Sequence, residues 1–411
     1  MLHNKKVLLL YTGNEQGSWG NISFTRPWHY YIMPGISYCA QALKNNPYIA
    51  ERCDITTRYF NSTVQDIAAI TDTVKNGDYD LIGFSSYCWN IATNLAIAKK
   101  IGKAKPSTRI LFGGPEVFCR SQQEADAFFT RNPFIDCLAF GESERKIAAL
   151  VRALLFDDGD GLAACTGFGF APHFAFGANF DIEYVTAELD IPGIYPLSLD
   201  IPRTKDCGLA MVYETGRGCP YRCIYCQFGH RNHKPYRFDI ARVQKELAWL
   251  FEQRIDCIHF ADAVFDLLPD YAKNVMQFII DNNIATSTFF YCSFNKLDRA
   301  LAELFSRAQC QIGVGIQSTN PQVLHTIHRT LSPRLFKDIG NILAENPINF
   351  YTDLIFGLPS DNMQSFKTSF NQTLGLNPTF VMPFPLTLIK GTPLGDSPET
   401  CRVRRYEKQE I

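Results

Sequence analysis

The chain has 411 residues, of which 46% are hydrophobic, enough for two folded domains. Its 40 basic and 41 acidic residues give a net charge of -1, which argues against a dedicated nucleic-acid surface. No apolar run approaches the roughly 20 residues that span a bilayer, so we expect no membrane segment. The sequence begins without an apolar signal segment and contains 14 cysteines. We therefore predict a soluble, cytoplasmic protein whose thiols stay reduced.

The N-terminal part alternates short apolar runs with amphipathic segments, a pattern typical of a doubly wound parallel sheet. The runs predicted as strands are KKVLLLYTG, CDITTRYF, YDLIGFSSYCWN, TRILFGGPE and FIDCLAFGESE. Helices are predicted around 35–44, over 91–102 and after the last of these strands. TRPWHYYIMPG, which contains Trp28 and His29, is predicted to be a loop. We therefore predict one Rossmann-like domain over residues 1–155.

Small and polar residues follow three of the predicted strands, at the carboxyl ends where doubly wound sheets bind ligands. They are Ser85, Ser86, Gly113, Gly114, Gly141 and Glu142. Small side chains would let a large flat cofactor approach the backbone. Alternatively, the glycines only form tight turns between strands and helices.

Residues 156–206 are rich in glycine, phenylalanine and alanine, contain scattered prolines and show no clear period. This composition predicts a linker between two domains. Its aromatic residues argue against disorder, so we expect the linker to pack against both domains.

Three cysteines stand close together after the next predicted strand, in ETGRGCPYRCIYCQFGH. Cys219, Cys223 and Cys226 can ligate three irons of one cubane cluster, because thiolates are the ligands that iron–sulfur clusters select. No fourth cysteine follows nearby, so one iron would stay open for a substrate or cosubstrate. The main alternative is a structural zinc site completed by His230.

From residue 207 onward a pattern of strand, loop and helix repeats six times. The later strands are predicted in CIHFADAVF, STFFYCSF, QIGVGIQS, NFYTDLIFGLP and TFVMPFPLTL. The pattern predicts a partial (β/α)6 barrel of the TIM type over residues 207–395, followed by a tail over 396–411. Polar residues at the carboxyl ends of such strands are candidates for function.

The cysteine spacing, with Tyr225 just before the last cysteine, resembles the radical S-adenosylmethionine (SAM) superfamily. The resemblance implies a [4Fe-4S] cluster whose open iron chelates SAM, with Cys219, Cys223 and Cys226 as catalytic and metal-binding residues. It also implies one-electron cleavage of SAM to methionine and a 5′-deoxyadenosyl radical. An electron donor such as flavodoxin or ferredoxin would then be a partner.

Other residues match cofactor-binding positions of that family. Gln317 and Asp353 resemble residues near the SAM ribose. Arg329 resembles an arginine that pairs with the SAM carboxylate, a role that suits a planar guanidinium. Asp262 resembles an acidic residue that faces the SAM amino group, with helix capping as the alternative.

Asp266 resembles the same family pattern as Asp262, in which an acidic residue faces the SAM amino group or the substrate. Cys292 is predicted to be a buried thiol, with a radical relay as the alternative. Tyr291 and Asn295 occupy the same predicted rim and are candidates for contact with SAM or substrate.

The phrases IGFSSYCWN, ILFGGPE and AFGESE resemble the cobalamin-binding domain found ahead of many radical SAM domains. The resemblance implies that the small residues at the first domain's strand ends lie against cobalamin. Domains of the methionine-synthase type carry a D-x-H-x-x-G loop whose histidine ligates cobalt, and the loop over 11–21 here has no histidine. We therefore expect base-off cobalamin with no protein histidine ligand.

Together these resemblances imply a cobalamin-dependent radical SAM methyltransferase that acts on an unactivated carbon of a small molecule or peptide. A rearrangement or cyclisation with the same cofactors, without methylation, is one alternative. An enzyme like the RNA methylthiotransferases is another, but Cys39, Cys53 and Cys88 do not fall at the strand ends that its second cluster needs. A non-enzymatic carrier would leave Gln317 and Arg329 unexplained.

Overall fold

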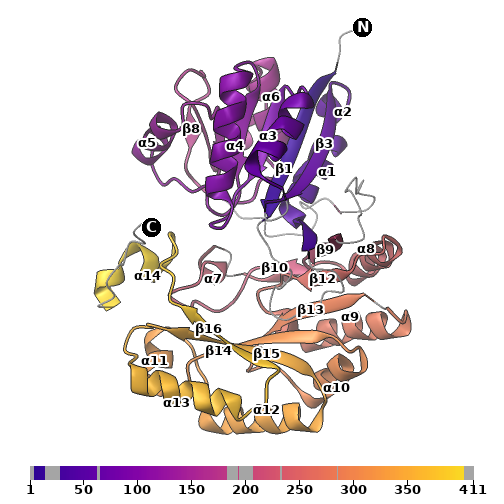
Figure 1. The fold of residues 1–411 in the computed structure, drawn as a ribbon, viewed down its shortest axis with the longest axis vertical. Coiled ribbons are helices and arrows are strands. Elements are labelled where there is room, and N and C mark those ends of the chain that lie inside the picture. Colours follow the sequence, from indigo (N-terminus) through magenta and orange to yellow (C-terminus); the bar gives the residue numbers. More distant parts are fainter. Residues whose placement is uncertain are drawn as a thin grey trace. The chain divides into compact units, whose positions relative to one another are not determined.

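The computed structural model describes residues 4–13, 28–62, 65–182, 193, 207–231, 234–284 and 286–401. Within these residues the chain forms two compact units, one ending at Val212 and the other beginning at Tyr213 (Figure 1). None of the helices in these ranges combines the length and the apolar character that a membrane crossing requires.

The first large sheet has the strand order β3-β1-β4-β5-β6-β7-β8. Its strands are β1 (Lys5–Gly13), β3 (Cys53–Asn61), β4 (Leu81–Ser85), β5 (Arg109–Gly113), β6 (Cys137–Ala139), β7 (Phe168–Phe170) and β8 (Ala178–Asn179). The five strands from β3 to β6 in this order pair in parallel, whereas β7 and β8 are antiparallel additions. The parallel part confirms the predicted doubly wound sheet.

Helices connect these parallel strands and, after β6, lead to β7. They are α1 (Pro34–Asn45), α2 (Pro47–Ala50), α3 (Ile67–Asn76), α4 (Ile91–Ala104), α5 (Gln122–Arg131), α6 (Ile147–Phe156) and the 3-10 helix η1 (Leu162–Ala164). The side chains of Asp66 and Ser121 cap α3 and α5 by accepting hydrogen bonds from backbone N–H groups of the first turn. In the core beneath the helices, the rings of Phe84 and Phe112 stack with centroids 4.8 Å apart.

The described part of the predicted linker differs from the expectation. It contains β7 and β8, and β7 pairs with β6 at the edge of the first sheet. Phe168 and Phe170 of β7 are buried. The beginning of this segment is therefore part of the first unit's sheet, while residues 183–192 and 194–206 lie outside the described residues.

The second large sheet has the order β16-β15-β14-β13-β12-β9-β2. The six predicted barrel strands are β9 (Cys207–Tyr213), β12 (Cys257–Phe260), β13 (Ser287–Cys292), β14 (Gln311–Gln317), β15 (Asn349–Phe356) and β16 (Phe380–Pro385). Neighbours from β12 to β16 pair in parallel. The prediction of six strand and helix repeats is confirmed.

A seventh strand, β2 (Trp28–Ile32), pairs in parallel with β9. The prediction of a loop at TRPWHYYIMPG was therefore wrong. Aromatic residues favour strands, but the partner that makes a strand of this segment lies far along the chain. Tyr31 and Ile32 of β2 are buried.

The remaining elements of the second unit are a short antiparallel ribbon and a series of helices (Figure 1). They are β10 (Gly216–Arg217), β11 (Tyr236–Arg237), α7 (Phe228–Arg231), α8 (Ile240–Glu252), η3 (Phe265–Leu267), α9 (Pro269–Asp281), α10 (Arg299–Arg307), α11 (Pro321–Thr326), α12 (Pro333–Glu345), α13 (Met363–Leu374), α14 (Pro393–Asp396) and η4 (Pro398–Cys401). Side-chain caps begin α8 at Asp239, α10 at Asp298 and α13 at Asn362.

Candidate active site

The three cysteines lie on the loop between β10 and α7. Cys219 and Cys223 are buried, and Cys226 is half-buried. The backbone N–H of Cys226 donates to the carbonyl oxygen of Cys223 at 3.1 Å, which folds this segment into a tight turn. Gly229 of α7 packs against the same loop, since a Cβ there would overlap the carbonyl oxygen of Tyr221. The loop is therefore compact, with three thiols on one short segment.

The thiols also affect each other's ionisation. Burial, with smaller contributions from Cys226 and Cys223, raises the pKa of Cys219 to about 11. Only the thiolate is a metal ligand, so a bound metal would have to displace the protons. Within the described residues, no three Cys, His, Asp or Glu side chains converge closely enough to share one metal ion. A cubane cluster does not need such convergence, because each cysteine ligates a different iron.

His230 does not join the thiols as the zinc alternative requires. Its Nε2 lies 3.1 Å from the carbonyl oxygen of Cys223 and donates a hydrogen bond to it. This contact fixes the start of α7 on the loop.

Arg329 reaches the cysteine loop from the segment after α11. Its Nη1 donates to Tyr225 Oη at 3.4 Å and lies 3.9 Å from Cys223 Sγ. Its Nη2 donates to the carbonyl oxygen of Gly315 on β14 at 2.7 Å. The structure therefore brings Arg329 and Tyr225, both predicted site residues, together beside a cluster ligand.

Gln317 and Asp353 lie on the strands next to this arginine. Gln317 ends β14, and Asp353 on β15 pairs in register with Gly315. Gln317 Oε1 and Asp353 Oδ1 are both buried, and neither has a hydrogen-bond partner among the described residues. Such oxygens cost free energy unless a donor meets them, so this edge of the sheet fits a ligand that offers hydroxyl or amino groups.

Replacing Asp353 by asparagine should change how the stability of the metal-free chain depends on pH. Burial raises the folded-state pKa of Asp353 to about 7, whereas an unfolded carboxyl titrates near 4, so the folded state binds this proton more tightly. The wild type should therefore lose stability relative to Asp353→Asn as the pH rises from about 4 to about 7. Urea unfolding at about pH 5 and about pH 8 measures the free energy of unfolding of both proteins. The variant should gain stability relative to the wild type at the higher pH. A difference that stays the same at both values would contradict the prediction.

Aromatic side chains of β13, β15 and β16 pack against one another in the second sheet. Phe289 on β13 and Tyr351 on β15 stack with centroids 5.4 Å apart, although β14 lies between them. Gly313 of β14 makes this possible, because a Cβ there would lie 2.8 Å from both rings. Tyr351 also stacks on Phe380 of β16 at 4.9 Å and hydrogen-bonds Tyr291 of β13. The hydroxyl of Tyr291, a predicted rim residue, is thus engaged within the protein.

The carboxylate of Asp262 is bound by neighbouring protein groups and does not face an open site. Its oxygens accept hydrogen bonds from the backbone N–H of Thr215 at 3.0 Å and from the Thr215 hydroxyl at 2.7 Å. Arg237 of β11 lies 3.4 Å away in an ion pair whose two side chains are almost fully buried. Asp262 does not cap a helix either, since η3 begins after Val264. This geometry favours a structural role over the predicted contact with SAM, and the capping alternative was wrong.

Asp266 and Cys292 lie close to Asp262. The backbone N–H of Ser293 donates to Asp266 Oδ1 at 2.8 Å, and burial raises the pKa of Asp266 to about 7. Cys292 is buried, and burial raises the pKa of its thiol well above the ordinary value. Cys292 is therefore a protonated core thiol.

In the first unit, hydrogen bonds join the predicted residues at the ends of β4 and β5 to one another and to Asn94. Asn94 Nδ2 donates to the carbonyl oxygen of Ser85 at 3.1 Å and to Ser86 Oγ at 3.0 Å. The Ser86 N–H donates to the carbonyl oxygen of Gly113 at 2.7 Å. Gly114 has φ +102°, and a Cβ there would overlap the Ser86 backbone. The turn itself therefore requires glycine at position 114, which agrees with the alternative that the glycines only form tight turns.

Sequence reasoning missed an aromatic group that follows β4. Tyr87 and Trp89 stack with centroids 4.7 Å apart, and Trp89 Nε1 donates to Tyr11 Oη at 3.0 Å. Both rings are half-buried. Their signal was present in IGFSSYCWN, where aromatic residues follow a strand at the edge that binds ligands in doubly wound sheets.

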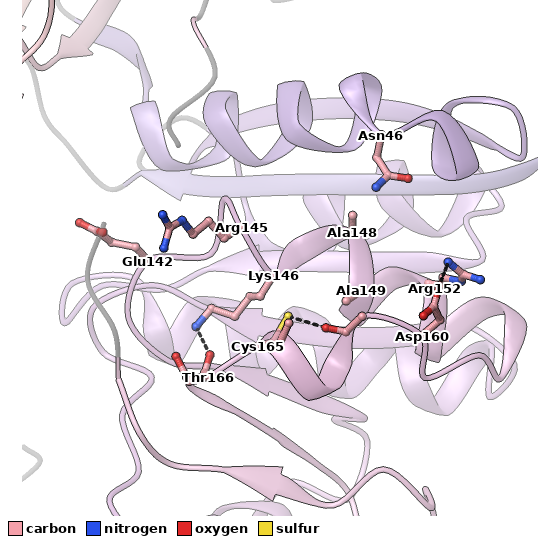
Figure 2. A pocket seen from close by; sticks show the side chains of 12 residues that line it. Asn46, Glu142, Arg145, Lys146, Ala148, Ala149, Arg152, Asp160, Cys165 and Thr166 are labelled. Carbon is pink, nitrogen blue, oxygen red and sulfur yellow. Dashed lines mark hydrogen bonds and ion pairs between the residues drawn. The ribbon is translucent and has the colours of Figure 1, made fainter. Parts of the chain in front are cut away.

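Glu142, after Gly141 at the end of β6, lines a cavity of about 360 Å³ in the first unit (Figure 2). Other charged groups in its wall are already paired. Lys146 Nζ donates to three backbone carbonyl oxygens at 2.6 to 3.0 Å, and Arg152 forms an ion pair with Asp160. These two cations are therefore used by the fold.

Residues 213–372, which contain the cysteine loop, Gln317, Arg329 and Asp353, match the family model described as the radical SAM superfamily. Over these residues the chain is similar to the radical SAM superfamily. The matched residues lie within the second unit and contain the strands β12, β13, β14 and β15.

The chain is similar to two methyltransferases. It is 28% identical over 332 residues to the 2-(S-pantetheinyl)-carbapenam-3-carboxylate methyltransferase of Streptantibioticus cattleyicolor, covering 76% of this chain and 46% of the relative. It is 26% identical over 309 residues to the cobalamin-dependent radical SAM methyltransferase TokK of Streptomyces tokunonensis, covering 72% and 45%. The chain thus spans about half the length of these relatives.

Solved structures show the same fold. The radical SAM methyltransferase TsrM of Kitasatospora setae aligns with a TM-score of 0.71 at 18% identity, covering 97% of this chain and 76% of TsrM. The cobalamin-dependent SAM radical enzyme OxsB aligns with a TM-score of 0.66 at 14% identity, covering 98% and 56%. These likenesses confirm the predicted architecture of a Rossmann-like domain followed by a partial TIM-type barrel.

Proposed function

We propose that this chain is a cobalamin-dependent radical SAM methyltransferase that methylates an unactivated carbon. The observation that carries the proposal is the compact loop of Cys219, Cys223 and Cys226, with Arg329 beside it, in a radical SAM domain. The doubly wound first unit supports cobalamin binding, because the similar fold of TsrM has been solved with cobalamin and a [4Fe-4S] cluster. The names of the two relatives support methyl transfer.

In this proposal, one group of residues binds the cluster and another group binds SAM. The three cysteine thiolates would hold the cluster, which when bound supplies the electron that cleaves SAM. Arg329 would pair with the SAM carboxylate through its planar guanidinium. Gln317 Oε1 and Asp353 Oδ1 would accept hydrogen bonds from the ribose hydroxyls, which would satisfy two buried oxygens that have no partner in the part of the chain that the structure describes.

Cobalamin binding is proposed for the carboxyl edge of the first sheet. Ser85, Gly113, Gly141 and Glu142 lie at ends of β4, β5 and β6, where small side chains suit a flat ligand. The absence of histidine from the sequence of the first loop supports a base-off form without a protein histidine ligand. A small-molecule or peptide substrate, a flavodoxin or ferredoxin donor and a cytoplasmic location are parts of the same proposal.

Arg329→Lys should weaken SAM binding about tenfold, because lysine keeps the charge but loses the two-pronged hydrogen bonding of the guanidinium. Equilibrium binding of SAM to the anaerobically purified, cluster-loaded variant measures this change. Arg334→Lys is the matched control, since Arg334 lies on α12 with its side chain 93% exposed. Equal SAM affinity in Arg329→Lys and the wild type would remove Arg329 from the site.

The proposal is tested with protein purified without oxygen from cells supplied with cobalamin. Iron, cobalt and zinc are measured, and then SAM and a reductant are added. Bound iron with stoichiometric cobalt, and release of both 5′-deoxyadenosine and S-adenosylhomocysteine, is the expected result. Iron without cobalt would refute the cobalamin part, and zinc alone would refute the whole proposal.

A further inference from the structure

The chain that follows β16 returns to the cysteine loop. The segment 389–396 ends with α14, and the backbone N–H of Leu394 in this helix donates to the carbonyl oxygen of Ile224 at 3.0 Å. A second contact joins the same parts of the chain, since Gln227 Nε2 donates to the carbonyl oxygen of Lys390 at 2.5 Å. Two hydrogen bonds therefore connect the cysteine loop to a segment that is distant in the sequence.

Ile224 is held from a second side as well. It directly follows Cys223, and its backbone N–H donates to the carbonyl oxygen of Ile327, just after α11, at 3.4 Å. The side chain of Ile224 is buried in one apolar cluster with those of Ile327 and Leu394. Arg329, whose Nη1 lies 3.9 Å from Cys223 Sγ, follows Ile327 by two residues. Ile224 thus connects the cysteine loop both to the arginine segment and to the segment that follows β16.

A buried threonine hydroxyl sets the conformation of the segment that follows β16. Thr392 is 1% exposed, and its Oγ1 donates to the carbonyl oxygen of Ile389 at 2.7 Å. The same oxygen accepts a hydrogen bond from the backbone N–H of Gly395 at 3.0 Å. The turn is tight, because a Cβ at Gly395 would overlap the carbonyl oxygen of Ile389. The hydroxyl of Thr392 therefore stabilises the turn that brings the N–H of Leu394 to Ile224.

We infer that Thr392 is a positioning residue for SAM at the cluster. Its hydroxyl fixes the turn that holds Ile224, and Ile224 fixes the position of Cys223 relative to Arg329. This role rests on the proposed function, in which SAM binds both the open iron and Arg329. One SAM molecule can reach both only while the distance between them is kept. In such a geometry a displacement of about 1 Å can lower the rate about 100-fold.

Thr392→Val tests this role, because valine keeps the shape of the side chain but loses both hydrogen bonds. In protein loaded with the cluster without oxygen, the variant should keep its iron but bind SAM about tenfold more weakly than the wild type. Electron paramagnetic resonance of the dithionite-reduced cluster gives a second measurement. The wild-type spectrum should change when SAM binds the open iron, and the variant should need correspondingly more SAM for the same change. Thr392→Ser keeps the hydroxyl and should match the wild type in both measurements.

Two further variants separate positioning from a general loss of stability. Thr71→Val removes another buried threonine hydroxyl, which donates to the carbonyl oxygen of Ile67 in α3 at 2.6 Å, and should leave SAM affinity unchanged. Gln227→Ala removes the hydrogen bond to Lys390 without changing the apolar cluster, and should weaken SAM binding about threefold. If Thr392→Val fails to fold, Gln227→Ala carries the test, and wild-type affinity in Gln227→Ala would then overturn the role.

The outcomes also separate this role from the proposed function. Weaker SAM binding in Thr392→Val, with normal iron content and recovery in Thr392→Ser, would support the role. Wild-type SAM affinity and a wild-type spectral response in the folded, iron-loaded Thr392→Val would overturn it, and so would an equal loss of affinity in Thr71→Val. A wild type that binds no cluster, or whose spectrum does not respond to SAM, would instead refute the proposed function.

Discussion

Alanine at any one of Cys219, Cys223 and Cys226 is expected to remove the bound iron and abolish SAM cleavage. Each thiolate would ligate one iron, and the loop offers no replacement, because His230 is already engaged by the carbonyl oxygen of Cys223. Iron and sulfide content, visible absorption and 5′-deoxyadenosine release from anaerobically prepared protein measure the loss. Release should fall to the background of the uncatalysed reaction.

Cys88→Ala is the matched control for this experiment. Cys88 is an exposed thiol of the first unit, so its loss removes a cysteine without changing the cluster loop. This variant should keep its iron and its release of 5′-deoxyadenosine. Retention of four irons in Cys219→Ala would mean that the cluster has other ligands and would contradict the assignment.

Asp262→Ala is expected to destabilise the protein by about 3 to 5 kcal/mol, the cost of leaving one member of a buried ion pair without its partner. The substitution would strand the buried Arg237 guanidinium and both hydrogen-bond donors of Thr215. Urea unfolding of the metal-free protein near neutral pH measures the change in the free energy of unfolding.

This experiment also separates the two roles considered for Asp262. Asp270→Ala, at an exposed position of α9, should change the stability by no more than about 0.5 kcal/mol and serves as the control. If Asp262→Ala unfolds like the wild type but no longer binds SAM once the cluster is loaded, Asp262 belongs to the cofactor site. Loss of stability would assign it to the scaffold.

The sequence predicted most of the fold because short apolar runs alternate with amphipathic helices. Elements with weaker signals were missed. In α5 only Ala125 and Phe129 are buried, so its apolar period is faint. The strands β7 and β8 have three and two residues, and only pairing with their neighbours makes strands of them. Short pieces of chain cannot reveal such pairing, because it depends on residues elsewhere.

The candidate site could be predicted to a similar degree. The cysteine motif is local, so its chemistry can be read from a few letters of sequence. Gln317, Arg329 and Asp353 come from separate elements, and the structure was needed to show that Gly315 links them. The partner of Asp262 could not be predicted, since Arg237 reaches it from a two-residue strand. A family resemblance suggests a role, whereas the local contacts decide whether a side chain is available for it.

The pairing of β2 with β9 has a consequence for how the chain folds during its synthesis. The ribosome releases β1 and β2 first, then the other strands of the first sheet, and only later β9, the strand against which β2 lies. Contacts between such distant segments slow folding, because a long loop must close before they form. Until then the aromatic segment WHYYI lacks its partner, and unpaired strands of this kind are prone to aggregate. Slow growth at low temperature should therefore increase the yield of folded protein.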